Sequence, residues 1–206
     1  MKLQLPETYD EITVRQYRLM WSAIDDHHDD TTTARRVVEI LGGLDAGDLK
    51  NADYADLNTA TAALRWIMDE PDPFTLQLPV QRRLYLEGIE YGFIPDWTKL
   101  TVAEYADLET FCHKGLFNYL EKAMAVMYRP IQKQGLDMYE IETYEPCDQR
   151  EAVMGDCPMS VCVAAMVFFC AIQKELATTM QRCSKARPQT VMQRLTAYIR
   201  SGAGTA

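Results

Sequence analysis

The residues best suited to metal chemistry form one short run, DDHHDD at positions 25–30. Imidazole and carboxylate groups are good ligands for zinc, nickel or iron. Adjacent side chains point in different directions, however, and His113 is the only other histidine of the sequence. Two interpretations remain: a solvated loop between two helices, or a metal-dependent enzyme that uses His27 and His28. We predict the loop, and therefore no metal site.

The cysteines are the second candidate for chemistry, because a cysteine thiolate is a strong nucleophile when a base faces it. Cys112 and His113 are instead neighbours in sequence, and no two cysteines form a C-x-x-C pair. We expect reduced thiols, with those of residues 157–170 filling a core. The six cysteines are Cys112, Cys147, Cys157, Cys162, Cys170 and Cys183.

Sequence motifs for phosphate binding or for a serine nucleophile are missing from the chain. It contains no G-x-G-x-x-G, no G-x-x-x-x-G-K-[ST] and no G-x-S-x-G. Nothing singles out a pair of carboxylates for acid–base catalysis among 30 acidic residues. We therefore predict no catalytic residues, no cofactor and a protein that is not an enzyme.

Composition indicates an acidic globular protein. The 206 residues are 48% hydrophobic and 25% charged, with a net charge of −9. A negative field repels phosphate backbones, so nucleic acid is not an expected partner. The longest apolar run, residues 161–172, is shorter than the ~20 residues needed to cross a bilayer, and no export signal precedes it. We expect a cytoplasmic protein without a membrane partner.

The periodicity predicts a mainly α-helical α+β protein: a helical bundle with a small antiparallel sheet. We expect a single domain over residues 1–206 that ends in a frayed tail at 201–206. Within it, residues 1–70 are a candidate N-terminal helical subdomain. The predicted helices cover residues 14–24, 31–41, 53–68, 102–114, 116–127, 158–182 and 188–199.

Alternation of apolar and polar residues predicts the strands. A hairpin is expected at about 82–93, where two alternating runs flank Glu87-Gly88, and a third strand at about 139–144. Residues 3–5 have the pattern of a weak edge strand. Residues 145–156 are expected to form a loop.

One phrase occurs twice in the sequence. Leu-Pro-Glu at 5–7 precedes Ile-Thr-Val-x-Gln-Tyr at 12–17, and Ile-Pro-Asp at 94–96 precedes Leu-Thr-Val-x-Glu-Tyr at 100–105. Each contains a capping box, in which the threonine and the residue three positions later hydrogen-bond each other's backbone amides. The two copies are either a coincidence or a repeated corner from a strand into a helix.

Charge is divided unevenly along the chain. Residues 1–156 carry a net charge of −14 and residues 157–206 a net charge of +5. Two interpretations stay open: the basic helical end docks on the acidic body, or it presents a basic surface to an acidic partner.

The run 161–172 is apolar around its whole helical circumference, so every side must be covered. Either this chain covers it as core, or part of it is a seam for a partner or a second copy. The residues of that seam would be Met166, Phe168, Phe169 and Ile172. Tyr128 and Arg129, at a predicted helix end, are further candidates for partner contact, because tyrosine and arginine commonly anchor interfaces. For Arg129 a charge that meets helix-end carbonyls or the acidic strand 140–142 is the alternative.

Four stretches together resemble small proteins of tailed bacteriophages, which are encoded among tail or virion-assembly genes and include tail assembly chaperones. They are YGFIPDWTKLTVAEYADLE (91–109), AVMYRPI (125–131), YEIETYE (139–145) and CPMSVCVAAMVFFCAIQKEL (157–176). The resemblance implies binding without a cofactor, which holds an aggregation-prone tail component in solution until it assembles. This chain departs from those phage proteins in its six cysteines and in its DDHHDD run.

We therefore expect a non-enzymatic phage tail or virion assembly protein that binds a phage polypeptide in the host cytoplasm, with a second copy of the chain as a further candidate partner. One alternative is a permanent structural component of the virion, such as a connector or tail protein. The other is the metal-dependent enzyme that uses the His27/His28 loop.

Overall fold

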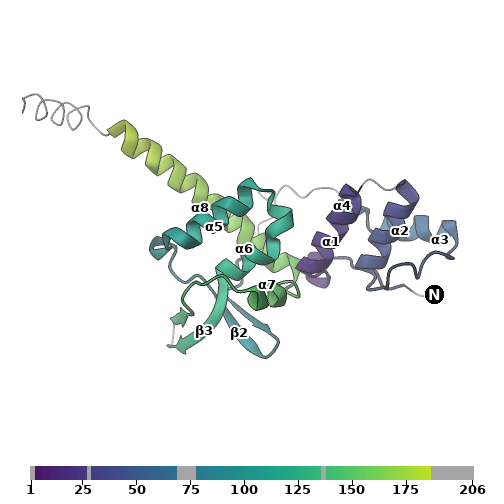
Figure 1. Cartoon of the computed structure of the whole chain (residues 1–206), viewed down its shortest axis with the longest axis horizontal. Coiled ribbons are helices and arrows are strands. Elements are labelled where there is room, and N and C mark those ends of the chain that lie inside the picture. The colour runs from purple at the N-terminus through teal and green to yellow at the C-terminus, as the bar shows by residue number, and fades with distance from the viewer. Residues whose placement is uncertain (1–2, 27–28, 69–77, 136–137, 187–206) are drawn as a thin grey trace, which may run out of the picture. The chain divides into compact units, whose positions relative to one another are not determined.

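The computed structural model describes residues 3–26, 29–68, 78–135 and 138–186. It shows a mainly helical α+β fold with one small antiparallel sheet, which confirms the predicted fold class (Figure 1).

Contacts divide the chain into two units, Met1–Val167 and Phe168–Ala206. The single domain over 1–206 and the subdomain over 1–70 stay predictions. The predicted helix 188–199 and the tail 201–206 lie outside the described residues.

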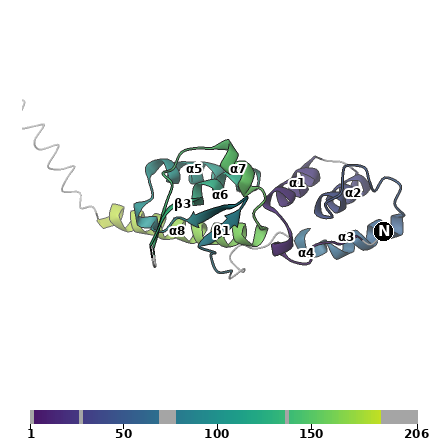
Figure 2. The same cartoon turned by 90° about the horizontal axis from the view of Figure 1, so that it is seen from below.

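In the first unit, α6 packs against several other helices, while α2, α3 and α4 form a separate group beside α1. In chain order the helical elements are η1 (Tyr9–Glu11), α1 (Val14–Asp25), α2 (Asp30–Leu41), α3 (Tyr54–Ala63), α4 (Arg65–Met68), η2 (Trp97–Lys99), α5 (Val102–His113), η3 (Leu116–Tyr119), α6 (Leu120–Met127), α7 (Asp148–Met154) and α8 (Met159–Ala186), of which α8 continues into the second unit. α6 contacts α1, α5 and α7, and most of its residues are buried. Figure 2 shows it beside α5 and α7. One part of the core is therefore built around α6, and a second part lies among α1, α2, α3 and α4, where Val37, Val38, Leu64 and Ile67 are buried.

Both predicted capping boxes are present. The Thr13 hydroxyl accepts from the Gln16 amide, and the Gln16 side chain accepts from the Thr13 amide. Thr101 and Glu104 make the same pair of bonds at the start of α5. Each box follows a short 3-10 helix and opens an α-helix of 12 residues. The repeated phrase thus forms a repeated corner, although a strand precedes only the second copy.

Several predicted helix boundaries differ from the structure. The helix predicted over 53–68 is interrupted at Leu64, which ends α3, and the short helix α4 begins at the next residue. The helix predicted over 116–127 begins as the 3-10 helix η3 before α6. A loop at 145–156 was the wrong prediction, because α7 forms there. Its short length and its acidic first turn gave no apolar periodicity.

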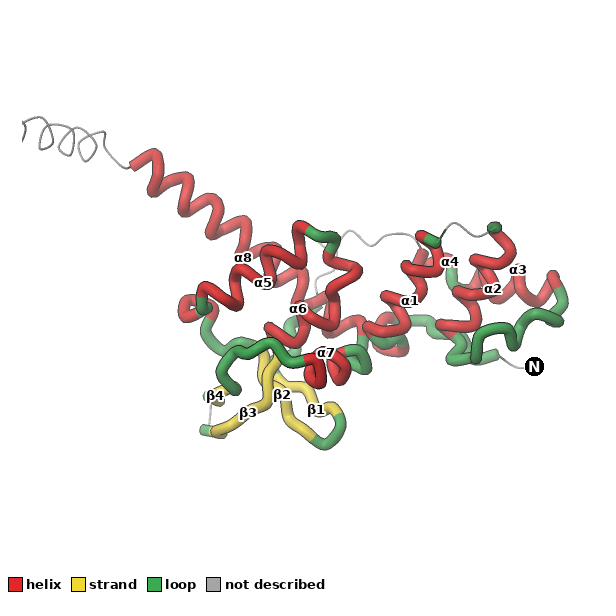
Figure 3. The backbone as a smooth tube through the Cα atoms, in the orientation of Figure 1, coloured by secondary structure: helices red, strands yellow, loops and turns green. Residues whose placement is uncertain are grey.

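The four strands pair in chain order, all antiparallel: β1 (Arg83–Leu86), β2 (Ile89–Phe93), β3 (Tyr128–Gln134) and β4 (Tyr139–Ile141) (Figure 3). β1 and β2 confirm the predicted hairpin, with positive φ at Glu87 (48°) and Gly88 (79°) in its two-residue turn. β4 confirms the core of the strand predicted at 139–144. β3 was missed, since Pro130 was interpreted only as a helix stop.

β4 folds back over β2 at a glycine. A Cβ on Gly92 would lie 2.8 Å from Tyr139 Cδ2 and 2.9 Å from Ile141 Cγ2. The Tyr139 hydroxyl donates a hydrogen bond of 2.6 Å to the Phe93 carbonyl. Only a residue without a side chain permits this approach.

Backbone hydrogen bonds join the start of α1 to the turn between α7 and α8. The amides of Val14 and Arg15 donate to the carbonyls of Cys157 and Gly155, each at 2.9 Å, and the Met159 amide donates to Ile12. The N-terminal helices are thereby tied to the rest of the first unit. Within the described part of the chain, no helix has the length and apolar character needed to cross a membrane.

Candidate functional site: an apolar groove beside α3

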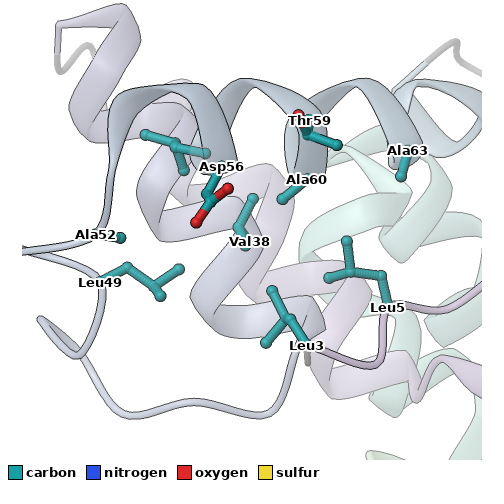
Figure 4. Close-up of a pocket in the computed structure, with 10 residues that line it drawn as sticks. Leu3, Leu5, Val38, Leu49, Ala52, Asp56, Thr59, Ala60 and Ala63 are labelled. Atoms are coloured by element: carbon teal, nitrogen blue, oxygen red, sulfur yellow. The ribbon is translucent and has the colours of Figure 1, made fainter. Parts of the chain in front are cut away.

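An open apolar groove of about 300 Å³ lies between α2, α3 and the N-terminal segment (Figure 4). Its lining residues are Leu3, Leu5, Val38, Leu49, Ala52, Asp56, Leu57, Thr59, Ala60 and Ala63. Three stretches of chain that are distant in sequence therefore build one surface, which we call the α3 groove.

Small residues on one face of α3 leave the space open. Asp56, Ala60 and Ala63 follow each other at spacings of four and three, which places them on one side of a helix. Thr59 satisfies its own hydroxyl by donating to the Ala55 carbonyl at 2.9 Å. The C-terminal half of the α3 wall thus has only the short side chains of Thr59, Ala60 and Ala63, which leave the groove open there.

The N-terminal segment forms the opposite wall. Leu3 and Leu5 point towards α3 in Figure 4. The predicted edge strand at 3–5 is therefore wrong: this segment makes no strand, and its leucines pack against helices. Gly42 permits the approach, because a Cβ there would lie 3.1 Å from Leu3 Cδ1 and 2.8 Å from the Val38 carbonyl oxygen. Trp66 Nε1 fixes the segment by donating to the Pro6 carbonyl at 3.3 Å.

The third wall of the groove is the loop that contains Leu49, and the buried carboxylate of Glu39 binds the backbone of this loop. Glu39 of α2 is fully buried, and its Oε1 accepts from the amides of Gly47 (3.0 Å) and Leu49 (3.2 Å). Arg35 Nη1 donates to the same oxygen at 2.8 Å, and Arg36 Nη1 to Oε2 at 3.3 Å. Burial acts to raise the pKa of Glu39, but these donors outweigh it and lower the pKa overall.

Asp56 is the one charged residue that lines the α3 groove. Its carboxylate points into the space in Figure 4, and among the described residues it has neither a hydrogen-bond nor an ion-pair partner. A place in the first turn of α3 is favourable for a carboxylate, since the helix dipole is positive there. The adjoining loop adds exposed Asp45, Asp48 and Asp53 against Lys50. The groove can therefore accept apolar groups that are accompanied by a positive charge.

Tyr128, one of the predicted contact residues, is fully buried where α6 passes into β3. Its hydroxyl donates to the Gln81 carbonyl at 2.7 Å, and burial raises its pKa far above the usual range for tyrosine. Phe93 lies against it with ring centroids 5.1 Å apart. Tyr128 thus contributes to the core in this conformation, and partner contact by it stays a prediction.

Arg129 is 5% exposed and pairs with Glu104, a partner that the sequence did not indicate. Glu104 Oε1 accepts from Arg129 Nη2, while Glu104 Oε2 accepts from the Thr101 amide at 2.6 Å. The guanidinium lies 5.9 Å from the ring centroid of Tyr144, and its Nε has no hydrogen-bond partner in the described part of the chain. Burial lowers the pKa of Arg129, and Glu104 opposes that shift. This pair ties α5 to β3.

The predicted seam of α8 is only partly covered. Met166 and Phe169 are buried, whereas Phe168 and Ile172 are half-buried and Ala171 is exposed. The start of the apolar run is therefore core, as one interpretation held, and coverage decreases after it. Contact of these four residues with a partner stays a prediction.

The described cysteines and histidines, which the sequence offered as candidates for catalysis or metal binding, do not come together in one site. Burial raises the pKa of Cys157 to about 12 and that of Cys162 well above its usual value, so both thiols are protonated at neutral pH. His113 is exposed at the end of α5. His27 and His28 lie outside the described residues, and among those described no three His, Cys, Asp or Glu side chains are grouped as a metal site would require.

Sequence reasoning missed the α3 groove, Glu39 and Asp56. Spacing within α3 is a weak signal, and no local pattern brings residues 3–5, 38–49 and 52–63 together. The fold and the groove define a mainly helical α+β protein with an open apolar surface and one unpaired carboxylate. No family model, no curated protein and no solved structure matches the chain.

Proposed function

We propose that this chain is a non-enzymatic assembly protein that binds another polypeptide in the α3 groove. The observation that carries the proposal is the lining itself, which is apolar, open to solvent and has one charged residue. The face from Asp56 to Ala63 covers eight residues, or seven helical steps of about 10 Å in all, which suits two turns of an amphipathic helix. Grooves of this kind bind helices through apolar residues at spacings of three and four.

The resemblance of four stretches to phage tail assembly proteins supports a more specific proposal. In it the chain is a tail assembly chaperone that acts in the host cytoplasm and shields an apolar segment of a tail component. The net charge of −9 suits this role, since excess like charge opposes self-aggregation while an apolar segment is bound.

The test is co-expression with the products of neighbouring tail genes, followed by co-purification. Ala60→Glu places a carboxylate in the groove, whereas Ala62→Glu places it on the exposed face of the same helix and is the matched control. We expect Ala60→Glu to reduce capture of the tail protein at least tenfold, because about 1.4 kcal/mol suffices for that and a buried unpaired charge costs more. The control should leave capture unchanged.

Equal capture by both variants would contradict binding in the α3 groove. Mass spectrometry of purified virions distinguishes the two assembly roles: a transient chaperone is missing from the particles, and a permanent component is present in them.

A further inference from the structure

We propose that residues 188–200 of one copy of this chain bind in the α3 groove of a second copy, with Arg194 facing Asp56. The proposal rests on the proposed function in one respect, because both use the same groove. It adds the identity of an occupant: a basic amphipathic segment supplied by the chain itself.

The sequence of this segment matches the groove in its apolar pattern. Helical spacing would place Val191, Met192, Leu195, Tyr198 and Ile199 on one face. The segment from residue 192 to residue 199 has eight residues, which as a helix would be seven steps or about 10 Å, and the groove wall from Asp56 to Ala63 has the same length. An apolar helical face and an apolar groove of equal length are the two halves of a helix-in-groove interface.

The charges are complementary as well. Residues 176–206 contain no acidic residue, and on a helix Arg194 would flank the apolar face. On the groove side, Asp56 has no ion-pair partner among the described residues, and exposed Asp48 and Asp53 lie close to it in sequence. An arginine beside the apolar face would therefore meet a carboxylate that no described residue of its own chain neutralises.

Binding between copies suits the length of the preceding helix. α8 has 28 residues, which corresponds to about 42 Å of helix before this segment begins. Such an interface is heterologous, because the segment of each copy uses the groove of the next. A phage polypeptide that enters the groove would displace the segment and separate the copies.

Sedimentation velocity of the full chain at about 1 to 100 µM tests the proposal, since that range covers interfaces of modest size. We expect association that increases with concentration and weakens with salt. Leu195→Asp should abolish it, whereas Gln193→Asp, which adds the same charge outside the apolar face, should weaken it far less. A monomer throughout the range, or equal association of these two variants, would overturn the proposal.

Charge reversal distinguishes exchange between copies from docking within one chain. Asp56→Arg and Arg194→Asp should each weaken association about tenfold, the scale of losing one ion pair and introducing a repulsion. Mixing the two variants should restore association, because each tail then meets an opposite charge in the other chain's groove. Restoration only in the double variant, independent of concentration, would mean docking within one chain and would overturn the proposal.

The outcome is separable from that of the proposed function. If the chain stays monomeric while Ala60→Glu still prevents capture of the tail protein, self-binding is wrong and the assembly role stands. If the copies associate through the groove but Ala60→Glu leaves capture unchanged, self-binding is right and the client binds elsewhere.

Discussion

Removing the Glu39 carboxylate should loosen the loop that carries Leu49 and forms one wall of the α3 groove. Glu39 is fully buried and accepts four hydrogen bonds, two from backbone amides of the loop and two from arginines. Hydrogen bonds to charged groups contribute about 1.5–3 kcal/mol each, but they do not add when they share one acceptor.

The expected loss in the free energy of unfolding depends on which hydrogen-bond donors each substitution leaves without an acceptor. Glu39→Ala removes every acceptor, although Gly47, Leu49 and both arginines are partly exposed and can reach water. We therefore expect a loss of about 2–4 kcal/mol in the free energy of unfolding, below the sum of the four bonds. Glu39→Gln keeps an oxygen that can accept the bonds of Oε1, so its cost should be about 1–2 kcal/mol.

Urea denaturation measures the global effect, and amide hydrogen exchange at Gly47 and Leu49 measures the local one. Exchange should accelerate about tenfold for each 1.4 kcal/mol by which the loop is destabilised. Glu90→Gln is the control: Glu90 pairs with Arg83 on the hairpin and accepts from Gln134 Nε2, both contacts are exposed, and glutamine keeps an oxygen acceptor, so the loss of the ion pair should cost about 1 kcal/mol at most. A Glu39→Ala cost no larger than that of the control would refute the reasoning.

The pH dependence of stability is a separate test of whether the ionised Glu39 carboxylate stabilises the folded state. The pKa of Glu39 is lower in the folded state than its usual value, so the carboxylate stabilises the fold above the ordinary carboxyl range, about 4.3. That contribution is lost as the pH falls through the folded-state pKa. The difference in unfolding free energy between the wild type and Glu39→Gln should therefore be largest near neutral pH and shrink towards pH 3. A difference that is constant or grows on acidification would contradict the assignment.

Two further substitutions test the ion pair between α5 and β3 and the close packing of β4 on β2. Arg129→Met leaves Glu104 buried without its partner, so it should cost about 3–5 kcal/mol, and adding Glu104→Gln should restore part of that loss in urea denaturation. Gly92→Ala should cost about 1–3 kcal/mol by overpacking against Tyr139, and thermal unfolding measures it. A Gly92→Ala variant as stable as the wild type would mean that β4 moves away without cost.

Local signals were readable from the sequence. The capping boxes at Thr13 and Thr101 depend on residues three positions apart, and both were predicted with the correct helix starts. The hairpin was predicted because its turn residues, Glu87 and Gly88, separate two alternating runs.

Features set by distant parts of the chain were not readable. Pro130 appeared to end a helix, yet its carbonyl accepts from the Glu142 amide at 2.9 Å, so a residue without an N–H still pairs within a sheet. The partner of Arg129 was sought on the nearby acidic strand and lies instead on α5. The α3 groove depends on Leu3 and Ala60, which only the tertiary fold brings together.

The two capping boxes differ at the residue three positions after the threonine, which is Gln16 in the first and Glu104 in the second. The distant partner of each side chain explains the difference. In each, one polar atom of that side chain closes the capping box and the other ties the helix to a second element. Gln16 Nε2 donates to the Ile40 carbonyl at the end of α2, which requires an amide donor. Glu104 Oε1 accepts from Arg129, which requires a carboxylate because the guanidinium is buried. The same local motif therefore makes a neutral hydrogen bond to α2 in the first copy and an ion pair with β3 in the second. Which of the two residues is used follows from its distant partner.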